Sequence, residues 1–207
     1  SNEDFMRLDN ISVLSKYWQR AQTKENLNVR GDFLFLKSHS CLASINNSFF
    51  TSEDISRGYI YIIRDPRDVA VSWAKFSNYS IDKSIDFITD SSSCIRWSNK
   101  GKFSKVPKKI VPKAFISSWD EHVESWTNNS LKVPKLYIKF EDLIEEKQKI
   151  IHEIKKFFEL NFEIKIENFN LKLKNILDTT SFDKMEEFEK TYGFNEANNW
   201  VKFFRKG

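Results

Sequence analysis

The stretch Tyr59-Ile-Tyr-Ile-Ile-Arg64-Asp65-Pro66-Arg67-Asp68-Val-Ala-Val-Ser72-Trp-Ala-Lys-Phe76 decides the fold of this chain. Residues 59–63 form a β-branched and aromatic run without charge, which is typical of a strand buried on both faces. Asp65 then stands where an N-cap belongs. Pro66 occupies the first helical position, where its missing N–H group costs nothing. We therefore predict a strand that leads directly into a helix, with Val69, Trp73 and Phe76 on one apolar face of that helix.

This junction has the chemistry of an anion site. Arg64 directly follows the predicted strand, and Ser72 lies about two turns into the helix on the side of its start. A guanidinium group, a hydroxyl group and a helix N-terminus that converge on one point favour a phosphate-bearing ligand. The alternative is an ordinary strand–helix junction in which Arg64 makes a surface ion pair, because short motifs have a false-positive risk.

The residues from Arg64 to Ser72 resemble the 3′-phosphate-binding motif of sulfotransferases that use 3′-phosphoadenosine 5′-phosphosulfate (PAPS). In that family the first Arg and the last Ser of the motif hold the 3′-phosphate, which implies these roles for Arg64 and Ser72. The resemblance implies an α/β fold of the P-loop-NTPase-like type, with three layers and a central parallel sheet flanked by helices. It also implies that residues 1–207 form a single domain.

A second buried-strand candidate, residues 33–37, ends in Lys37-Ser38-His39. Ligands bind at the carboxyl edge of the strands in α/β sheets, and a histidine can accept a proton near neutral pH. The family has Lys-Thr-His or Lys-Ser-His here, so the resemblance implies that His39 is the catalytic base and that Lys37 assists near the reacting sulfate. The alternative for a lone histidine is a surface loop residue.

We place the other two histidines, His122 and His152, outside the site. His122 lies in a predicted helix over 115–126 with Trp119, Val123 and Trp126 inward, and this segment is similar to a family segment that we interpret as structural packing. His152 lies in a charged helix and is expected to be exposed to solvent.

Residues 135–140 predict a third strand, and Glu141-Asp142 opens a helix that continues to Leu160. The family pattern here is Leu-Tyr-x-x-Tyr-Glu-Asp-Leu, whose second Tyr approaches the adenine. This chain has Phe140 at that position, which keeps a stacking face and loses the hydroxyl group. We also predict helices from about Ile11, over 81–88 and over 166–177, although the last segment contains a rival strand-like alternation.

Two further segments resemble family motifs. Residues 179–185 are similar to Thr-Ser-Phe-x-x-Met, which implies that the adenosine side is lined by Thr180, Ser181 and Phe182. By itself this segment is an N-cap followed by a helix. The last five residues resemble the start of Arg-Lys-Gly-x-x-Gly-Asp-Trp, which implies further 3′-phosphate contacts from Arg205, Lys206 and Gly207. The alternative there is a basic tail.

Composition limits the class of protein. The chain has 207 residues, of which 40% are hydrophobic and 30% charged, as in globular proteins. A formal net charge of +4 is mild for a nucleic-acid binder and fits a protein that handles an anionic small ligand. Its two cysteines, Cys41 and Cys94, lack CxxC spacing, which favours a reducing, cytoplasmic setting without a metal site. We find neither a signal peptide nor an apolar run of the roughly 18 residues that span a bilayer.

The chain departs from the family pattern at both ends. The family begins with a strand and a Tyr-Pro-Lys-Ser-Gly-x-Thr-Trp loop that cradles the 5′-phosphosulfate, and no such sequence is present here. The family's carboxyl-terminal Gly-Asp-Trp and the short dimerisation segment of some members lie beyond Gly207. We therefore expect a fragment that lacks the first strand and loop and that is inactive, or nearly so, when tested alone.

The resemblance implies an enzyme that moves a sulfuryl group from PAPS to a hydroxyl or amine group of a small-molecule or glycan acceptor, with a His base and no metal. We expect no nucleic-acid or membrane partner, and a homodimer is compatible with the family. One alternative is a non-catalytic relative that binds PAPS or its desulfated product PAP. The other is a nucleic-acid binder that uses the six lysines between Lys100 and Lys113, a segment otherwise interpreted as a solvated loop.

Overall fold

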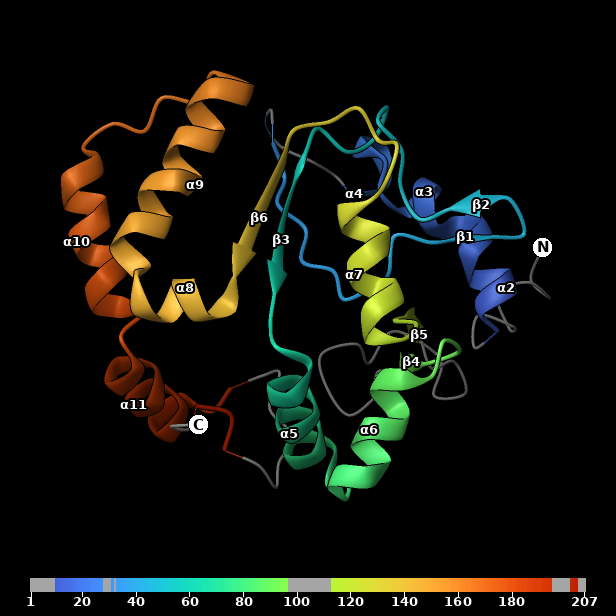
Figure 1. Ribbon diagram of the computed structural model, residues 1–207. Coiled ribbons are helices and arrows are strands. Elements are labelled where there is room, and N and C mark those ends of the chain that lie inside the picture. The colour runs from blue at the N-terminus through green and yellow to red at the C-terminus, as the bar shows by residue number, and fades with distance from the viewer. Residues whose placement is uncertain (1–9, 28–30, 32, 97–112, 195–201, 205–207) are drawn as a thin grey trace. The chain divides into compact units, whose positions relative to one another are not determined.

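The computed structural model describes residues 10–27, 31, 33–96, 113–194 and 202–204 (Figure 1). The chain forms two compact units. Unit 1 comprises Ser1–Tyr59 and Ile85–Val133, and unit 2 comprises Ile60–Ser84 and Pro134–Gly207.

Unit 2 is built on two adjacent strands, β3 (Tyr59–Ile63) and β6 (Lys135–Lys139). Their arrows point the same way, and each strand leads directly into a helix (Figure 1). β3 is followed by α5 (Pro66–Ser77) and β6 by α8 (Phe140–Glu145). Parallel strands that alternate with helices define an α/β fold, so the predicted class is confirmed.

The burial of β3 differs from the prediction. Ile62 is 50% exposed, whereas Ile138 in β6 is 2% exposed. A run of uncharged apolar residues allows a strand to be buried on both faces. Whether other elements cover both faces depends on tertiary packing, and here one side of β3 is partly exposed.

Helix α5 begins as the sequence predicts. The Asp65 carboxylate accepts a hydrogen bond from the Arg67 backbone N–H group at 2.8 Å, and Pro66 occupies the first turn. The helix ends at Asn78, which has the left-handed φ of 55° that ends many helices. The fully buried positions of α5 are Ala70 and Ala74, whereas the predicted apolar face of Val69, Trp73 and Phe76 is only half-buried.

Helix α6 (Ile81–Thr89) lies close to α5 because Ser84, which is completely buried, donates a hydrogen bond to the Ala70 carbonyl at 2.7 Å. This helix agrees with the prediction for residues 81–88. A small hydroxyl side chain at the contact allows the two helix backbones to approach closely.

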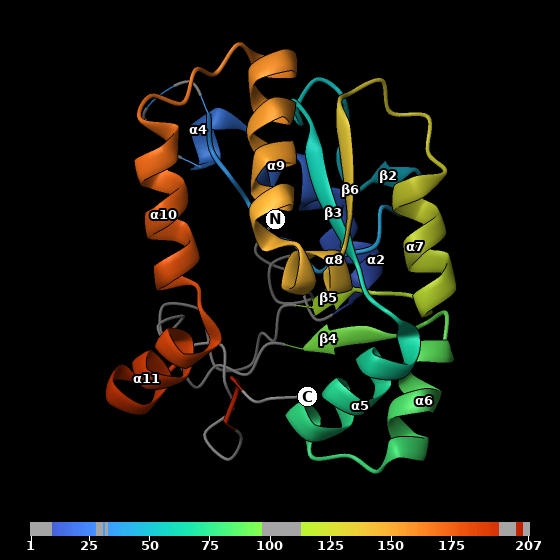
Figure 2. The same ribbon diagram turned by 60° about the vertical axis from the view of Figure 1, so that its left-hand side comes forward.

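The remaining helices in the described part of unit 2 are α9 (Lys147–Phe162), α10 (Phe169–Thr179) and α11 (Phe182–Tyr192). The predicted continuous helix from Glu141 to Leu160 is wrong, because the backbone at Glu146 (φ −118°, ψ 35°) separates α8 from α9. Helix α10 confirms the helical interpretation of its segment. Figure 2 shows α9 and α10 side by side. Ile150 and Phe157 of α9 and Leu173 of α10 are buried.

The described part of unit 1 begins with a series of short helical segments instead of the one predicted helix. They are α2 (Ile11–Leu14), the 3-10 turn η1 (Ser15–Tyr17), α3 (Trp18–Ala21) and α4 (Lys24–Leu27). The N-cap is Asn10, whose side chain accepts a hydrogen bond from the Ser12 N–H group at 2.9 Å. Ser15 is buried and its hydroxyl group donates a hydrogen bond to the Ser12 carbonyl.

Two antiparallel strand pairs in the described part of unit 1 were not predicted. In the first, β1 (Ser44–Ile45) pairs with β2 (Ser48–Phe49). Its turn residues Asn46 and Asn47 have φ values of 50° and 62°, as a type I′ turn requires. In the second, β4 (Cys94–Arg96) pairs with β5 (Lys113–Phe115). Because Phe115 belongs to β5, the next helix, α7 (Trp119–Thr127), begins four residues later than predicted.

The predicted buried strand over 33–37 is wrong. Residues 33–43 lie in neither a helix nor a strand, and the exposed fractions of Phe33, Leu34, Phe35 and Leu36 range from 39% to 72%. A strand forms only where a neighbouring strand supplies hydrogen bonds in register, which an apolar run does not specify. No helix among the described residues is both long and apolar enough to cross a membrane.

Candidate functional site

Two predicted nucleotide-binding residues meet at the end of the unit 2 sheet. Arg64 is the first residue after β3, and Phe140 is the first residue after β6. Because adjacent parallel strands end at the same edge of a sheet, both side chains start from that edge. The guanidinium carbon of Arg64 lies 4.5 Å from the centroid of the Phe140 ring. This cation–π contact is worth about 0.5–2 kcal/mol, depending on desolvation.

A second contact joins the same two strand ends. The backbone N–H group of Asp65 donates a hydrogen bond to Oε1 of Glu141 at 3.3 Å. Consecutive residues at the end of β3 therefore contact consecutive residues at the end of β6. The Arg64–Phe140 and Asp65–Glu141 contacts hold the β3–α5 turn against the β6–α8 turn.

The second arginine of the motif has a different partner. The guanidinium group of Arg67 donates to both carboxylate oxygens of Asp65, with an Nη2–Oδ2 distance of 2.6 Å. These hydrogen bonds, together with that from the Arg67 backbone, lower the pKa of Asp65 to about 2. Asp65 is therefore an ionised N-cap at neutral pH, and Arg67 is engaged with that cap.

Ser72 lies on α5, the helix that begins at this turn, and its side chain is half-buried. The placement on the helix agrees with the sequence prediction. Its contact with a 3′-phosphate remains a prediction.

The predicted adenosine residues Thr180, Ser181 and Phe182 form the junction between α10 and α11. Nζ of Lys147, the first residue of α9, donates to the Thr180 carbonyl at 2.7 Å. Ser181 occupies the N-cap position of α11, as predicted, but its side chain makes no capping hydrogen bond. This junction is therefore attached to the start of α9, the helix that follows α8, and Phe140 is the first residue of α8.

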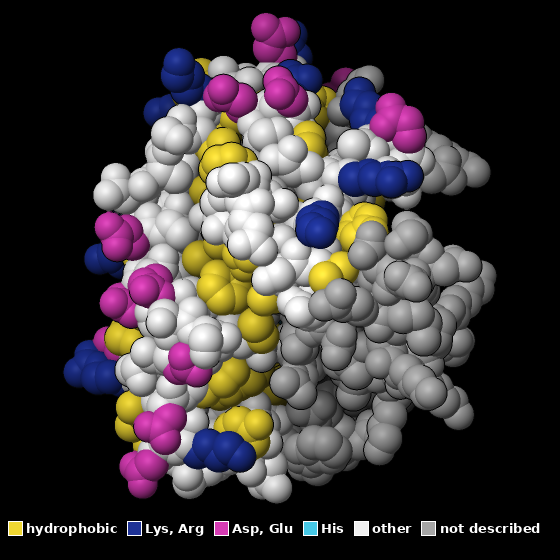
Figure 3. Space-filling view, turned by 90° about the vertical axis from the view of Figure 1, so that its right-hand side faces the viewer, with side chains coloured by type: hydrophobic (Ala, Val, Ile, Leu, Met, Phe, Trp, Pro, Cys, Tyr) yellow, Lys and Arg dark blue, Asp and Glu magenta, His cyan; other side chains and the backbone are white. Residues whose placement is uncertain are grey.

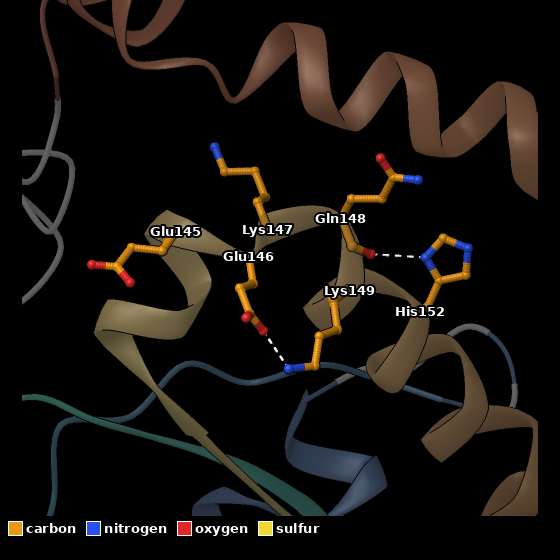
Figure 4. A pocket seen from close by; sticks show the side chains of 6 residues that line it. All are labelled: Glu145, Glu146, Lys147, Gln148, Lys149 and His152. Carbon is orange, nitrogen blue, oxygen red and sulfur yellow. Dashed lines mark hydrogen bonds and ion pairs between the residues drawn. The ribbon is translucent and has the colours of Figure 1, made fainter.

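A shallow hollow of about 400 Å³ lies where α8 meets α9, lined by residues 145–149 and His152 (Figure 4). Lys149 makes an ion pair with Glu146, and a ring nitrogen of His152 lies 2.8 Å from the Gln148 carbonyl oxygen. His152 is exposed, as predicted, and its ring contacts Phe169. Because the charges in this hollow compensate one another, it is a weaker candidate than the strand ends.

In unit 1, the loop with the predicted catalytic residues Lys37 and His39 is exposed and lies against α7. Nε2 of His122 is 3.3 Å from the His39 carbonyl oxygen. Burial is the main cause that lowers the pKa of His122 below its ordinary value. His122 is therefore neutral at pH 7, and with a carbonyl as its partner Nε2 must be the donor.

The residues after His39 are held by the same helix. Nε1 of Trp126 donates to the Ser40 carbonyl at 3.0 Å, and the Leu42 N–H group donates to Oγ of Ser125 at 3.1 Å. The Cys41 thiol, whose pKa is raised by burial, also contacts Oγ of Ser125 at 3.2 Å.

His122, Ser125 and Trp126 are spaced i, i+3 and i+4 and so share one face of α7. Trp126 also packs edge-on against Tyr59, which agrees with the packing role predicted for this segment. We did not predict from the sequence that polar atoms on this face of α7 hold the backbone of residues 39–42. The helical spacing of His122, Ser125 and Trp126 was the feature of the sequence that could have indicated it.

The predicted site residues divide between the two units. Lys37 and His39 lie in unit 1, and the described nucleotide-binding candidates lie in unit 2, so their approach to one another remains a prediction. Arg205, Lys206 and Gly207 lie outside the described residues. In the described part of the chain, no three His, Cys, Asp or Glu side chains are grouped so that they could hold a metal ion.

Comparison with known proteins identifies the relatives of this chain. A family model described as "Sulfotransferase domain" matches residues 2–207. The chain is 31% identical over 153 residues to a 3-beta-hydroxysteroid sulfotransferase of Cavia porcellus, a match that covers 73% of this chain and 45% of that protein. It is 24% identical over 153 residues to Sulfotransferase 1B1 of Canis lupus familiaris, covering 73% and 44%.

Among solved structures, the chain is similar to mouse sulfotransferase SULT7A1 complexed with PAP. The TM-score is 0.46 and the identity 19%, over 71% of this chain and 48% of that chain. The matched part of the chain spans somewhat less than half the length of the curated relatives.

Proposed function

Because the chain belongs to the sulfotransferase family, we propose that the protein transfers a sulfuryl group from PAPS to a hydroxyl or amine group of a small-molecule or glycan acceptor. The observation that carries this proposal is the contact between Arg64 and Phe140 at the start of α5. Both units would then form one sulfotransferase domain. A cytoplasmic location and a homodimer belong to the same proposal.

Arg64, Ser72 and the N-terminus of α5 would hold the 3′-phosphate of the nucleotide. A guanidinium group fits phosphate oxygens with paired hydrogen bonds, and the positive end of a 12-residue helix favours an anion. Contact with Phe140 supports this role, because the ring restricts the guanidinium group and lowers the entropy that Arg64 loses when it binds phosphate. Arg205, Lys206 and Gly207 would add contacts from the end of the chain.

Phe140, with Thr180, Ser181 and Phe182, would frame the adenosine. The aromatic side chain of Phe140 offers an apolar surface for a base. Because Phe140 has no hydroxyl group, its side chain would supply no hydrogen bond to the nucleotide. Base recognition would therefore depend on stacking and on the polar groups of the α10–α11 junction.

His39 would accept the proton of the acceptor, and Lys37 would stabilise negative charge close to the reacting sulfate. A well-placed base contributes about 10²–10⁴ in rate. PAPS supplies the activated sulfuryl group. The attachment of residues 39–42 to α7 supports the role of His39, because a base must be held in place to act.

Titration calorimetry with adenosine 3′,5′-bisphosphate and with adenosine 5′-monophosphate tests the nucleotide site. We expect clear binding of the bisphosphate and at least tenfold weaker binding of the monophosphate. Equal affinities would contradict a 3′-phosphate site. A transfer assay with the complete gene product, PAPS and a panel of phenols, alcohols and amines then tests catalysis, and binding without transfer would indicate the non-catalytic relative.

The nucleic-acid alternative depends on Lys100–Lys113, which lies outside the described residues except for Lys113. On the described part of the face in Figure 3, Lys and Arg side chains are mixed with Asp and Glu side chains, so that part has no uniformly basic field. A nucleic-acid binder would show affinity that falls steeply with salt. We expect only weak retention on nucleic acid at 150 mM salt.

A further inference from the structure

We propose that Glu141 is a positioning residue that holds Arg64 in place for recognition of the 3′-phosphate. The inference rests on the proposed function for the identity of the ligand. Its structural basis is independent of that ligand, since it comes from the hydrogen bond between the Glu141 carboxylate and the Asp65 backbone.

The hydrogen bond between Glu141 and the Asp65 N–H group restrains the backbone of the preceding residue, Arg64. The N–H group of Asp65 belongs to the peptide unit whose carbonyl comes from Arg64, so the hydrogen bond to Glu141 fixes the plane of that peptide. The Arg64 side chain starts one bond from this peptide and ends 4.5 Å from the ring of Phe140, the neighbour of Glu141. The same two-residue segment of β6–α8 thus restrains both the backbone and the side chain of Arg64.

The negative charge of Glu141 indicates that this residue does not contribute to phosphate binding through its charge. A carboxylate beside a proposed phosphate site repels the ligand, so the electrostatic effect of Glu141 on phosphate binding is unfavourable. The Asp65 side chain already accepts from Arg67 and caps α5, so it does not restrain its own N–H group. Glu141 provides that restraint from the other strand end.

A simpler role for Glu141 is that of an acidic residue in the first turn of α8, where negative charge interacts favourably with the helix dipole. Asp142 occupies the same first turn and provides a matched control. Removal of either carboxylate changes the charge at the helix start, but of these two carboxylates only that of Glu141 accepts a hydrogen bond from the Asp65 N–H group in the described part of the chain. Variants of Glu141 and Asp142 therefore distinguish the positioning of Arg64 from stabilisation of the start of α8.

The test compares Glu141→Ala, Glu141→Gln and Asp142→Ala with the wild-type protein, using calorimetry with adenosine 3′,5′-bisphosphate and adenosine 5′-monophosphate. We expect Glu141→Ala to weaken the bisphosphate about five- to tenfold, equivalent to the loss of one hydrogen bond, and the monophosphate less than twofold. Glu141→Gln keeps an oxygen acceptor and removes the repulsive charge, so it should bind the bisphosphate as tightly as wild type or more tightly. Asp142→Ala should not differ from wild type.

A second measurement does not need the nucleotide. In hydrogen-exchange NMR, Glu141→Ala should speed exchange of the Asp65 amide, and Glu141→Gln and Asp142→Ala should not. Three results would overturn the positioning role. They are an equal loss of affinity for both nucleotides in Glu141→Ala, weak binding of the bisphosphate by Glu141→Gln, and unchanged exchange of the Asp65 amide in Glu141→Ala. Wild-type protein that binds no bisphosphate would overturn the proposed function, whereas normal wild-type binding that is unchanged in Glu141→Ala would overturn only this inference.

Discussion

The guanidinium group of Arg64 lies against the ring of Phe140, with 4.5 Å between the guanidinium carbon and the ring centroid. These residues follow two strands that are far apart in the sequence and adjacent in the sheet. The contact joins a residue expected to bind phosphate to one expected to stack on a base, so the two ends of a nucleotide would be recognised from one edge of unit 2.

The two arginines of the motif should behave differently. Arg64→Ala should weaken binding of adenosine 3′,5′-bisphosphate at least tenfold, because a charged hydrogen-bonding partner of the phosphate is lost. Arg67→Ala should weaken it less than threefold, because Arg67 is bound to Asp65. Calorimetry measures both affinities, and a larger loss in Arg67→Ala would show that the roles have been assigned to the wrong arginine.

The aromatic shape of the side chain at position 140 should affect nucleotide affinity more than its polarity does. Phe140→Leu should weaken binding of the bisphosphate about threefold to tenfold, because the variant loses the aromatic ring, which Arg64 contacts and on which a base would stack. Phe140→Tyr keeps that ring and should bind at least as tightly as the wild type. Equal binding by the Leu variant would remove Phe140 from the site.

The capping carboxylate predicts a particular dependence of stability on pH. The pKa of Asp65 falls from an ordinary value of 3.8 to about 2 in the folded protein. A lowered carboxyl pKa stabilises the fold above 3.8, and this contribution is lost as the pH falls through about 2. Asp65→Asn should therefore have a lower melting temperature than wild type at pH 7, with the difference decreasing between pH 3.8 and pH 2. Circular dichroism melts measure it, and a difference that does not vary with pH would contradict the assignment.

The face of α7 that carries His122, Ser125 and Trp126 should affect the rate of catalysis more than the affinity for the nucleotide. His122→Ala should lower kcat with acceptor and PAPS about tenfold, because the carbonyl of His39 loses its donor. The affinity for adenosine 3′,5′-bisphosphate should stay within twofold. His152→Ala, which removes an exposed histidine on α9, is the matched control and should leave both quantities unchanged.

The partial burial of His122 adds a pH signature. Because burial lowers its pKa, the neutral form stabilises the fold above the unfolded pKa of about 6.5, and this stability decreases as the pH falls toward the folded pKa. The melting temperature of the wild type should thus fall more between pH 7 and pH 5 than that of His122→Gln. Parallel curves for the two proteins would show that His122 is not restrained in the neutral form.

Local chemistry made several parts of the fold predictable. The N-cap of Asp65 and the Pro66 start of α5 depend on neighbouring residues alone, and both are confirmed. The strand over 59–63 also agrees with the structure. The early helix start at Phe115 and the buried strand over 33–37 are wrong because each depends on what the segment pairs with. The hairpin at Asn46-Asn47 also has a local signal, because two consecutive Asn residues favour the positive φ values of its turn.

The sequence by itself determined the α/β class, the strand–helix junction at Arg64 and the family to which the chain belongs, because these depend on residue types at short, regular spacings. Only the tertiary structure decided that Arg64 meets Phe140, that Glu141 holds the Asp65 backbone, and that α7 holds the residues after His39. Such contacts join segments that are distant in the sequence. They arise when strands pair and helices pack, and no local pattern of residues specifies which side chains those events bring together.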